Sequence, residues 1–254
     1  WKMSGAGNDF VLLRGLPRGR SGAALARRLC DRRSGIGADG MLSISRQGRS
    51  IRLDYWNADG SSAFCGNGSR CAALWATTHG WTNKTRFVLD TIRGALMVRI
   101  TGKGRAEVEM PIPRDLRLSQ RITVLGKTHT VHFVDTGVPH AVLFVPDIET
   151  INVKTLGRAL RFHKAFVQAG ANVDFVSTKN GSLCLRTYER GVEDETCACG
   201  TGVIASAFVA CALDKTGPSI KVKVRSGATL KASFLDGAKL EGPGEVIFTG
   251  EVRL

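Results

Sequence analysis

Apolar and polar residues alternate in many short stretches of this chain, and Gly, Asn or Asp separates one stretch from the next. A period of two residues is typical of half-buried β-strands, and the separating residues are typical of turns. The pattern predicts strands over residues 9–13, 51–56, 86–89, 96–100, 106–110, 122–124, 130–135, 141–145, 173–177, 182–189, 220–224, 229–234 and 245–252. The chain is therefore expected to contain many more strands than helices.

Four helices are predicted among these strands. They cover residues 21–30, 69–77, 152–162 and 202–213. Ser21 is a candidate N-cap for the first helix. The second and fourth are rich in alanine and follow glycines, and the third is amphipathic. Two prolines in the segment 111–114 indicate a crossing between two halves of the chain.

Two short motifs occur twice, in the same order and at similar spacing. Residues 3–11 can be laid over residues 135–143, which aligns Asn8 with His140. Further along, the Cys-Gly-x-Gly turn at Cys65 is repeated at Cys199, and each turn precedes an alanine-rich helix. Chance similarity between glycine-rich loops is the alternative, but two matches in order favour a duplicated unit.

The 254 residues suffice for two medium-sized domains or one large one, and a hydrophobic content of 43% is ordinary for a globular protein. No apolar run reaches the length that spans a bilayer, and the first residues do not resemble a signal peptide. We therefore expect a cytoplasmic protein without a membrane partner.

The chain has seven cysteines, and this odd number without a signal peptide argues against a disulfide framework. Their spacing lacks the CxxC pairs of zinc sites, so no metal is expected. The net charge of +14 fits either an anionic partner or a solvated basic surface. No aromatic residues alternate with the basic ones to stack on bases, so nucleic acid is not the expected partner.

Each Cys-Gly-x-Gly turn could support a reactive thiol beside an anion-binding site. A cysteine at a helix N-terminus lies beside unpaired backbone N–H groups and the positive end of the helix dipole. Both features stabilise a thiolate and are expected to lower the pKa of the thiol. The same N–H groups can hold a carboxylate, and the glycines allow it to approach closely. A single such turn could equally contain a buried structural thiol.

Two such turns suggest a reaction. If the halves face each other, one thiolate can remove the α-proton of an amino acid while the opposite thiol donates a proton to the other face. The carbanion's charge spreads onto the carboxylate, where the helix N-termini oppose it. This inverts the α-carbon without pyridoxal phosphate or another cofactor.

Five sequence blocks resemble the signature of the diaminopimelate epimerase family. They are Lys-Met-Ser-Gly-Ala-Gly-Asn-Asp-Phe at 2–10, Cys-Gly-Asn-Gly-Ser-Arg-Cys at 65–71, Thr-Gly-Val-Pro-His at 136–140, Asn-Val-Asp-Phe-Val at 172–176 and the longer block 188–202, which contains the second turn. The resemblance implies an α/β (α+β) fold of two pseudo-symmetric domains, each a curled, mostly antiparallel sheet around a central helix, with the active-site cleft between them. It implies halves at 1–113 and 114–244, a last strand near 245–254 that returns to the first half, and a homodimer.

The resemblance also implies an activity and a set of site residues. Members of this family interconvert LL- and meso-diaminopimelate in bacterial lysine and peptidoglycan biosynthesis. Cys65 and Cys199 match the catalytic cysteines, and His140 and Glu189 match the pair that tunes them. The positions that match the family's substrate-binding groups are Asn8, Asn57, Gly66, Asn67, Asn172, Arg190, Gly200 and Thr201. Among these, Arg190 corresponds to the clamp for the distal carboxylate.

Two positions depart from the family pattern. Many members have Asn before the Pro-His pair, where this chain has Val138, and some have Gln where it has Gly40. Both differences remove polar groups from the distal end of the substrate site. A racemase for another amino acid is therefore the alternative, and a non-catalytic basic binding protein on the same scaffold is a second one.

Overall fold

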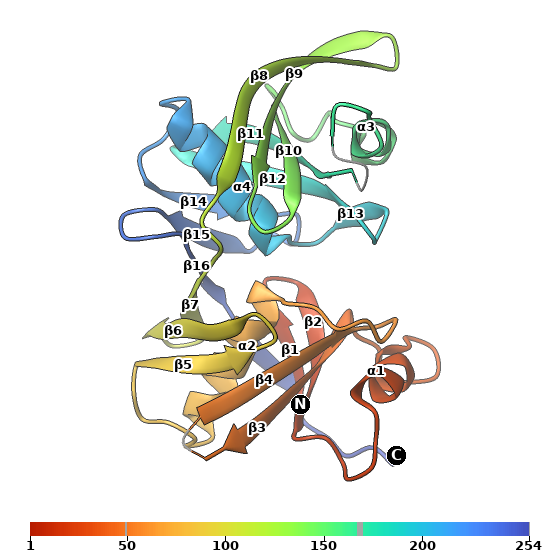
Figure 1. The fold of residues 1–254 in the computed structure, drawn as a ribbon, viewed down its shortest axis with the longest axis vertical. Helices are drawn as coiled ribbons and strands as arrows, with labels where there is room; N and C mark the ends of the chain where they lie inside the picture. Colours follow the sequence, from red (N-terminus) through yellow and green to blue (C-terminus); the bar gives the residue numbers. More distant parts are fainter. Residues whose placement is uncertain (49, 167–169, 254) are drawn as a thin grey trace. The chain divides into compact units, whose positions relative to one another are not determined.

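The computed structural model describes residues 1–48, 50–166 and 170–253. It divides into two compact units (Figure 1). The first comprises Trp1–Glu109 and Glu241–Leu254, and the second comprises Met110–Leu240. Each unit has its own part of the sheet and its own helices, and each is described by itself below.

The first unit is a mostly antiparallel sheet with two helices. Its elements are β1 (Lys2–Gly5), β2 (Asn8–Arg14), α1 (Gly22–Cys30), β3 (Gly40–Gln47), β4 (Ser50–Asn57), α2 (Gly66–Thr78), β5 (Arg86–Thr91), β6 (Gly94–Gly102), β7 (Arg105–Glu109) and β17 (Glu245–Phe248). Strands β1–β2, β3–β4, β5–β6 and β6–β7 pair antiparallel, whereas β2–β3 and β4–β5 pair parallel across α1 and α2. The chain returns at its end, where β17 pairs antiparallel with β1.

The second unit repeats this arrangement. Its elements are β8 (Arg114–Val124), β9 (Lys127–Asp135), β10 (Pro139–Phe144), α3 (Val153–Arg161), β11 (Asn172–Lys179), β12 (Ser182–Glu189), β13 (Asp194–Thr196), α4 (Gly200–Ala212), β14 (Ser219–Lys223) and β15 (Thr229–Ser233). Strands β9–β10, β11–β12 and β14–β15 pair antiparallel, and β10–β11 and β12–β14 pair parallel across α3 and α4. Strand β16 (Lys239–Pro243) then leads back and pairs with β7.

The two central helices form because their sequences suit burial on every side. Helices α2 and α4 are each 13 residues long and rich in small apolar residues. Helix α2 contacts β1, β2, β3, β4, β6 and β7, while α4 contacts β9, β10, β11, β12, β14 and β15. Strands surround each helix and bury most of its residues, so each sheet curls around its helix (Figure 1). Each helix begins directly after a cysteine, Cys65 or Cys199, which is its N-cap.

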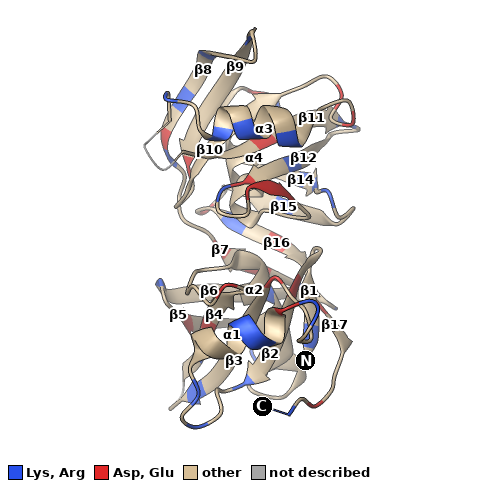
Figure 2. Cartoon of the chain, turned by 90° about the vertical axis from the view of Figure 1, so that its right-hand side faces the viewer, with Lys and Arg blue, Asp and Glu red and all other residues tan. Residues whose placement is uncertain are grey.

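The outer helices are amphipathic and cover part of one sheet face in each unit. Helix α1 buries Leu25 and Leu29 against Met41 and carries Arg27 and Arg28 on its exposed side. Helix α3 buries Val153 and Leu160 within the apolar cluster of the second unit. Figure 2 shows Lys and Arg on both helices, so part of the positive charge is on solvated surface.

The strand register shows that the two duplicated units correspond residue by residue. In both β3–β4 and β11–β12, which are eight-residue strands, the third residue of one strand pairs with the sixth of the other. These pairs are Leu42 with Tyr55, and Asp174 with Thr187. The residue facing the start of β3 is Phe10, and the residue facing the start of β11 is His140. His140 therefore corresponds to Phe10, and its alignment with Asn8 from sequence is wrong by two residues.

The four predicted helices are confirmed, with small shifts at their ends. Ser21 caps α1 as expected, because its side chain accepts a hydrogen bond from the Ala24 amide. The second and fourth helices begin earlier than predicted, since the glycines after each cysteine are already helical. Strands β1, β3, β13 and β16 were not predicted, and the last strand ends at Phe248 rather than at residue 252.

Candidate active site

The first predicted thiol, Cys65, lies at the N-terminus of α2 in extended backbone conformation. Its Sγ accepts a hydrogen bond from the Gly68 amide at 3.4 Å, which satisfies one of the free N–H groups of the first turn. The thiol also donates to Oδ1 of Asn8 at 3.6 Å. Asn67, the second helical residue, is buried and donates to the same oxygen at 3.3 Å. The structure thus brings three predicted residues, Cys65, Asn8 and Asn67, into one cluster.

Charged residues fix the amide of Asn8 from behind. Its Nδ2 donates to Asp39 at 2.6 Å, and Arg32 pairs with both Asp39 and Asp9. Lys2 adds a second cation on Asp9. Because Nδ2 faces a carboxylate, Oδ1 is the atom that faces Cys65. This orientation holds an acceptor, rather than a donor, against the thiol.

A buried guanidinium lies behind the same turn. Arg70 is fully buried on α2, and its Nη2 donates to Oδ1 of Asn67 at 2.8 Å. Burial lowers the pKa of Arg70 to about 10. Its Nη1 has no hydrogen-bond partner in the structure. Arg70 positions Asn67, which in turn contacts Asn8.

Asn57 ends β4, and its side chain is held by two neighbours. Tyr55 donates its hydroxyl to Oδ1 of Asn57 at 2.7 Å, while Nδ2 donates to Ser61 at 2.9 Å. The departure at Gly40 has a structural explanation here. A Cβ on residue 40 would lie 2.4 Å from Cε2 of Tyr55 and 2.7 Å from its hydroxyl oxygen. The tyrosine and the Trp56 carbonyl oxygen, which would lie 2.6 Å from the same Cβ, occupy the space that a longer side chain at position 40 needs.

The second predicted thiol, Cys199, is the N-cap of α4 and is only 6% exposed. Its Sγ lies 3.3 Å from the hydroxyl of Thr201, and Gly200 and Thr201 begin the helix. Burial raises the pKa of the Cys199 thiol well above its ordinary value, and the nearby charges of Glu189 and Asp174 raise it further. The expectation that the helix N-terminus lowers this pKa is therefore wrong for Cys199, because burial and two carboxylates outweigh the dipole.

His140 and Asn172 lie at the ends of neighbouring parallel strands of the second unit. Nδ2 of Asn172 lies 3.3 Å from Nε2 of His140, and the Arg190 amide donates to Oδ1 of Asn172 at 2.7 Å. Glu189 ends β12, and Val138 lies in the turn before β10. Thus Cys199, Thr201, Glu189, His140, Asn172 and Arg190 all belong to one unit, as Asn8, Asn57, Cys65, Gly66 and Asn67 belong to the other.

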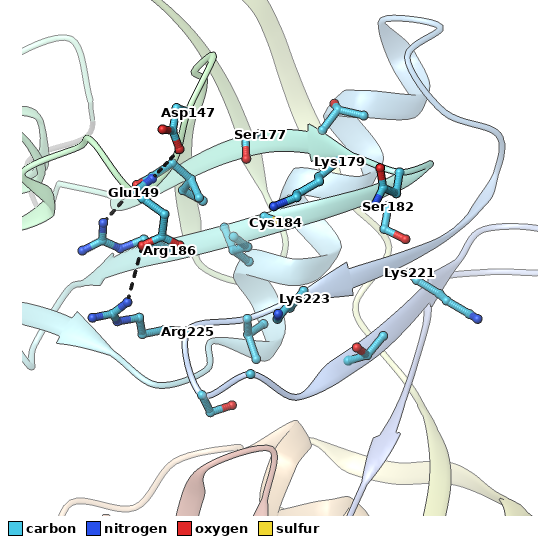
Figure 3. A pocket seen from close by; sticks show the side chains of 18 of the residues that line it. Asp147, Glu149, Ser177, Lys179, Ser182, Cys184, Arg186, Lys221, Lys223 and Arg225 are labelled. Carbon is cyan, nitrogen blue, oxygen red and sulfur yellow. Dashed lines mark hydrogen bonds and ion pairs between the residues drawn. The ribbon is translucent and has the colours of Figure 1, made fainter.

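The second unit also has an open pocket of about 960 Å³ that none of the predicted residues lines (Figure 3). At one end Arg186 forms a two-point ion pair with Glu195, at 2.7 Å for each bond. Lys179, Lys221 and Lys223 line the other side.

The described residues contain no group of three or more His, Cys, Asp or Glu placed to hold a metal ion. Within these same residues, no helix is long and apolar enough to cross a membrane.

Comparison with known proteins identifies the family. The profile described as diaminopimelate epimerase matches residues 1–114 and 132–252. The chain belongs to the diaminopimelate epimerase family. A protein of that name from Aquifex aeolicus is 39% identical over 269 residues, covering 99% of this chain and 94% of the relative. One from Chlorobaculum tepidum is 37% identical, covering 99% of this chain and the whole relative.

Solved structures with low identity share the fold of this family member. A phenazine biosynthesis protein of the PhzF family from Bacillus anthracis matches with a TM-score of 0.76 at 12% identity, covering 100% of this chain and 97% of that one. A hydroxyproline epimerase from Agrobacterium vitis matches with a TM-score of 0.67 at 16% identity, covering 97% and 90%. The predicted α/β fold with curled sheets is confirmed.

Several residues around the two cysteines were not predicted from the sequence. They are Asp39, Tyr55, Arg70, Asp174 and Thr187. One of them had a sequence signal, because Asp174 is a charged residue between apolar ones in the predicted strand 173–177. Tyr55 and Arg70 lie two and three residues from the side chains that they hold, Asn57 and Asn67. Asp39 and Thr187 contact residues that are 31 and 13 positions away in the sequence.

Proposed function

We propose that this protein is a diaminopimelate epimerase, which interconverts LL-2,6-diaminopimelate and meso-diaminopimelate in bacterial lysine and peptidoglycan biosynthesis. The observation that carries the proposal is the pair of cysteines, Cys65 and Cys199, at the N-termini of equivalent helices in two duplicated units. Relatives named diaminopimelate epimerase, 34–39% identical over nearly the whole chain, support the substrate.

In the proposed reaction the two thiols act on opposite faces of one α-carbon. One cysteine, as the thiolate, removes the α-proton and becomes a thiol. The other, as the thiol, donates its proton to the opposite face and becomes the thiolate, so the product has the inverted configuration. The reverse reaction starts from these exchanged protonation states. The raised pKa of Cys199 suits a proton donor in the substrate-free enzyme.

The carbanionic intermediate needs stabilisation at the reacting carboxylate. In the proposal, backbone N–H groups of Gly66, Asn67, Gly200 and Thr201 bind this carboxylate at the two helix N-termini. Asn8, Asn57 and Asn172 hold the polar groups of the substrate, and Arg190 binds the distal carboxylate. His140 and Glu189 act on Cys199, to which Glu189 is electrostatically coupled. No cofactor is part of this mechanism.

We further propose that the functional halves are residues 1–113 and 114–244, with the last strand completing the first half. The enzyme is proposed to be a cytoplasmic homodimer, as the family resemblance implies. Neither a membrane nor a nucleic acid has a role in the proposed reaction.

The decisive assay follows conversion of LL-diaminopimelate to the meso form. In D₂O, deuterium should appear at the inverted α-carbon, and Cys65→Ser or Cys199→Ser should nearly abolish inversion. Cys197→Ser is a matched control because Cys197 is exposed and lies two residues from Cys199. Full activity in a Cys65→Ala, Cys199→Ala double variant would contradict the two-thiol mechanism.

A racemase of another amino acid is the second candidate, and Val138 favours it, since valine cannot donate a hydrogen bond to a polar distal group. A panel of amino acids assayed for inversion separates the two. If Arg190→Ala impairs diaminopimelate turnover no more than turnover of a monocarboxylic amino acid, the distal role of Arg190 is wrong. A basic binding protein without activity would instead show strongly salt-dependent retention on nucleic acid and no inversion.

A further inference from the structure

The guanidinium of Arg70, on α2, is buried without a counter-ion. Its side chain has no exposed surface. Nη2 donates to Oδ1 of Asn67 at 2.8 Å, Nε donates to the carbonyl of Pro243 at 3.5 Å, and Nη1 has no hydrogen-bond partner. Within the described part of the chain, no carboxylate pairs with it. A buried charge without a partner is costly, so this cation needs a balancing anion.

The place of Arg70 in its helix adds to this cost. The N-terminus of a helix carries partial positive charge, which disfavours a cation there. Long side chains in a helix point back toward its N-terminus, and Arg70 accordingly reaches Asn67 in the preceding turn. The guanidinium therefore lies beside the turn that Cys65 caps. An anion at this turn would offset both positive charges.

Two cysteines are the candidates for that anion. The negative groups that act on the Arg70 guanidinium are the thiolate forms of Cys71 and Cys65. Cys71 is fully buried, and burial raises the pKa of its thiol to about 12, so it stays protonated at neutral pH. Cys65 is partly exposed, and its sulfur accepts a hydrogen bond from the Gly68 amide at 3.4 Å. Cys65 is therefore the thiol that can supply the balancing charge.

Most other charged residues on the strands around α2 already have partners. They form the pairs Lys2–Asp9, Arg52–Asp54, Arg99–Glu107 and Arg105–Glu241, while Arg14 and Arg46 lie over the ring of Trp81. Behind Asn8, both Asp9 and Asp39 pair with Arg32. Glu245 of β17 acts on Cys71. Of these residues, Arg105 is the one that acts on the Arg70 guanidinium, and a cation cannot balance it.

Cys199 lies beside a charge of the opposite sign. A Cβ added to Gly202, in the first turn of α4, would be 2.6 Å from Oδ1 of Asp174. This oxygen accepts a hydrogen bond from the Thr187 hydroxyl at 2.7 Å, and Oδ2 lies 2.6 Å from Nδ1 of His140. The Asp174 carboxylate is thus held against the turn that Cys199 caps.

The two half-sites differ again at the position of Arg70. Five residues after Cys65 the chain has Arg70, whereas five residues after Cys199 it has Ile204, which is also fully buried. Burial, and then the charges of Glu189 and Asp174, raise the pKa of the Cys199 thiol. A buried cation therefore accompanies one cysteine, and carboxylates accompany the other.

We propose that Arg70 is a positioning residue that acts through Cys65, because its buried charge holds Cys65 as the thiolate in the substrate-free enzyme while Cys199 is the thiol. The inference rests on the proposed two-thiol reaction and deepens it by assigning the first base and the first acid. In that turnover Cys65 gains the α-proton and Cys199 gives its own proton to the opposite face, so the two exchange protonation states.

The first test uses the wild-type enzyme without substrate. Alkylation by iodoacetamide is followed against pH for each cysteine by mass spectrometry of the peptides. The midpoint of Cys65 should lie at lower pH than that of Cys199. The midpoint, unlike the rate at a single pH, does not depend on how exposed each thiol is. The reverse order would overturn the proposal, and this test decides it even where substitutions of Arg70 prevent folding.

Two substitutions separate the charge of Arg70 from its hydrogen bond. Arg70→Gln removes the charge but keeps a side-chain N–H for Asn67, and Arg70→Lys keeps the charge. The glutamine variant should raise the Cys65 midpoint by roughly 1–3 pH units, the effect of losing one neighbouring opposite charge. The lysine variant should stay near the wild-type midpoint. Ile204→Met, at the equivalent position of α4, is the packing control and should leave the Cys65 midpoint unchanged.

The pH dependence of turnover gives a second readout. The low-pH limb of kcat/KM for diaminopimelate should move upward with the Cys65 midpoint in Arg70→Gln and stay in place in Arg70→Lys. A purely structural role would lower kcat/KM at every pH in both variants.

The proposal is also overturned if Arg70→Gln leaves the Cys65 midpoint unchanged, or if the glutamine and lysine variants raise it equally. The midpoints need no turnover to be measured. A Cys65 midpoint that depends on the Arg70 charge, in a protein that does not invert diaminopimelate, would therefore refute the proposed function while leaving the role of Arg70 intact.

Discussion

The thiol of Cys65 and the side-chain carbonyl of Asn8 are 3.6 Å apart, and the thiol donates to this oxygen. The opposite contact comes from the Gly68 amide, which donates to the same sulfur at 3.4 Å. An acceptor favours the protonated thiol, whereas a donor favours the thiolate. Cys65 is thus held between two contacts with opposite effects on its protonation.

Asn8→Ala should therefore make the Cys65 thiolate easier to form. Loss of the carbonyl acceptor removes a contact that favours the thiol and keeps the Gly68 amide, which favours the thiolate, so the pH at which Cys65 reacts with iodoacetamide should decrease. Mass spectrometry of the alkylated peptides measures this midpoint for each cysteine separately. The midpoint of Cys199 in the other unit is the internal control, and an increase for Cys65 would contradict the assigned direction.

Glu189→Gln should have a related effect on Cys199. Burial raises the pKa of this thiol most, and the charge of Glu189 is the next cause. Removing that charge lowers the thiol pKa, so alkylation of Cys199 should begin at a lower pH than in the wild type. Glu149→Gln is the matched control, since Glu149 is an exposed residue paired with Arg225 at 3.8 Å. Equal shifts in both variants would mean that net charge, rather than the position of Glu189, is responsible.

The central helices and the duplicated fold can be predicted from sequence, because local sequence signals determine them. A cysteine before Gly-x-Gly and an alanine-rich segment predicts a capped central helix, and Cys65 and Cys199 both have that role. Repetition of the motif predicts the duplicated fold. Strand β3 was missed because residues 40–45 are almost all buried and give no clear alternation.

The residues beneath the helix that follows each cysteine could not be predicted in the same way. They depend on strand register, which pairs Asp174 with Thr187 in the second unit and Leu42 with Tyr55 in the first. The same dependence explains why the pKa expectation for Cys199 was wrong. A helix N-terminus is visible in the sequence, but the two carboxylates that oppose it come from the strands β11 and β12.

Gly202→Ala should destabilise the protein, because the added Cβ would lie 2.6 Å from a carboxylate that Thr187 and His140 already hold in place. Overpacking of this kind costs about 1–3 kcal/mol in the free energy of unfolding. Gly217→Ala is the matched control, since a Cβ there meets nothing within 4 Å. Chemical denaturation of both variants measures the difference. Equal stabilities would show that the carboxylate can move away from α4.

Asp9→Asn should reduce the acid sensitivity of folding. Burial alone would raise the pKa of Asp9, but hydrogen bonds from Arg32 and Lys2 hold it well below its usual range. A carboxyl with a lowered pKa in the folded state stabilises the fold above its unfolded pKa, and this contribution is lost as the pH falls through the acid range. The variant should be less stable at neutral pH, and its free energy of unfolding should decrease less steeply below about pH 4. Asp214→Asn, on an exposed turn after α4, controls for loss of one charge. Parallel curves for wild type and Asp9→Asn would contradict this role.

Tyr55→Phe should weaken substrate binding more than it slows the reaction. The hydroxyl of Tyr55 orients Asn57 by donating to its Oδ1, and the ring fills the space above Gly40. Asn57 is proposed to hold the substrate, so a loosely oriented amide should raise KM for diaminopimelate severalfold while kcat changes little. Gly40→Gln is the complementary variant. It should lose activity, because its Cβ would meet the ring at 2.4 Å and the Trp56 carbonyl oxygen at 2.6 Å, and Tyr55→Ala should not restore the activity, since the backbone carbonyl remains. If Tyr55→Phe lowers kcat with KM unchanged, the tyrosine acts on the chemical step, and the role assigned to Asn57 is wrong.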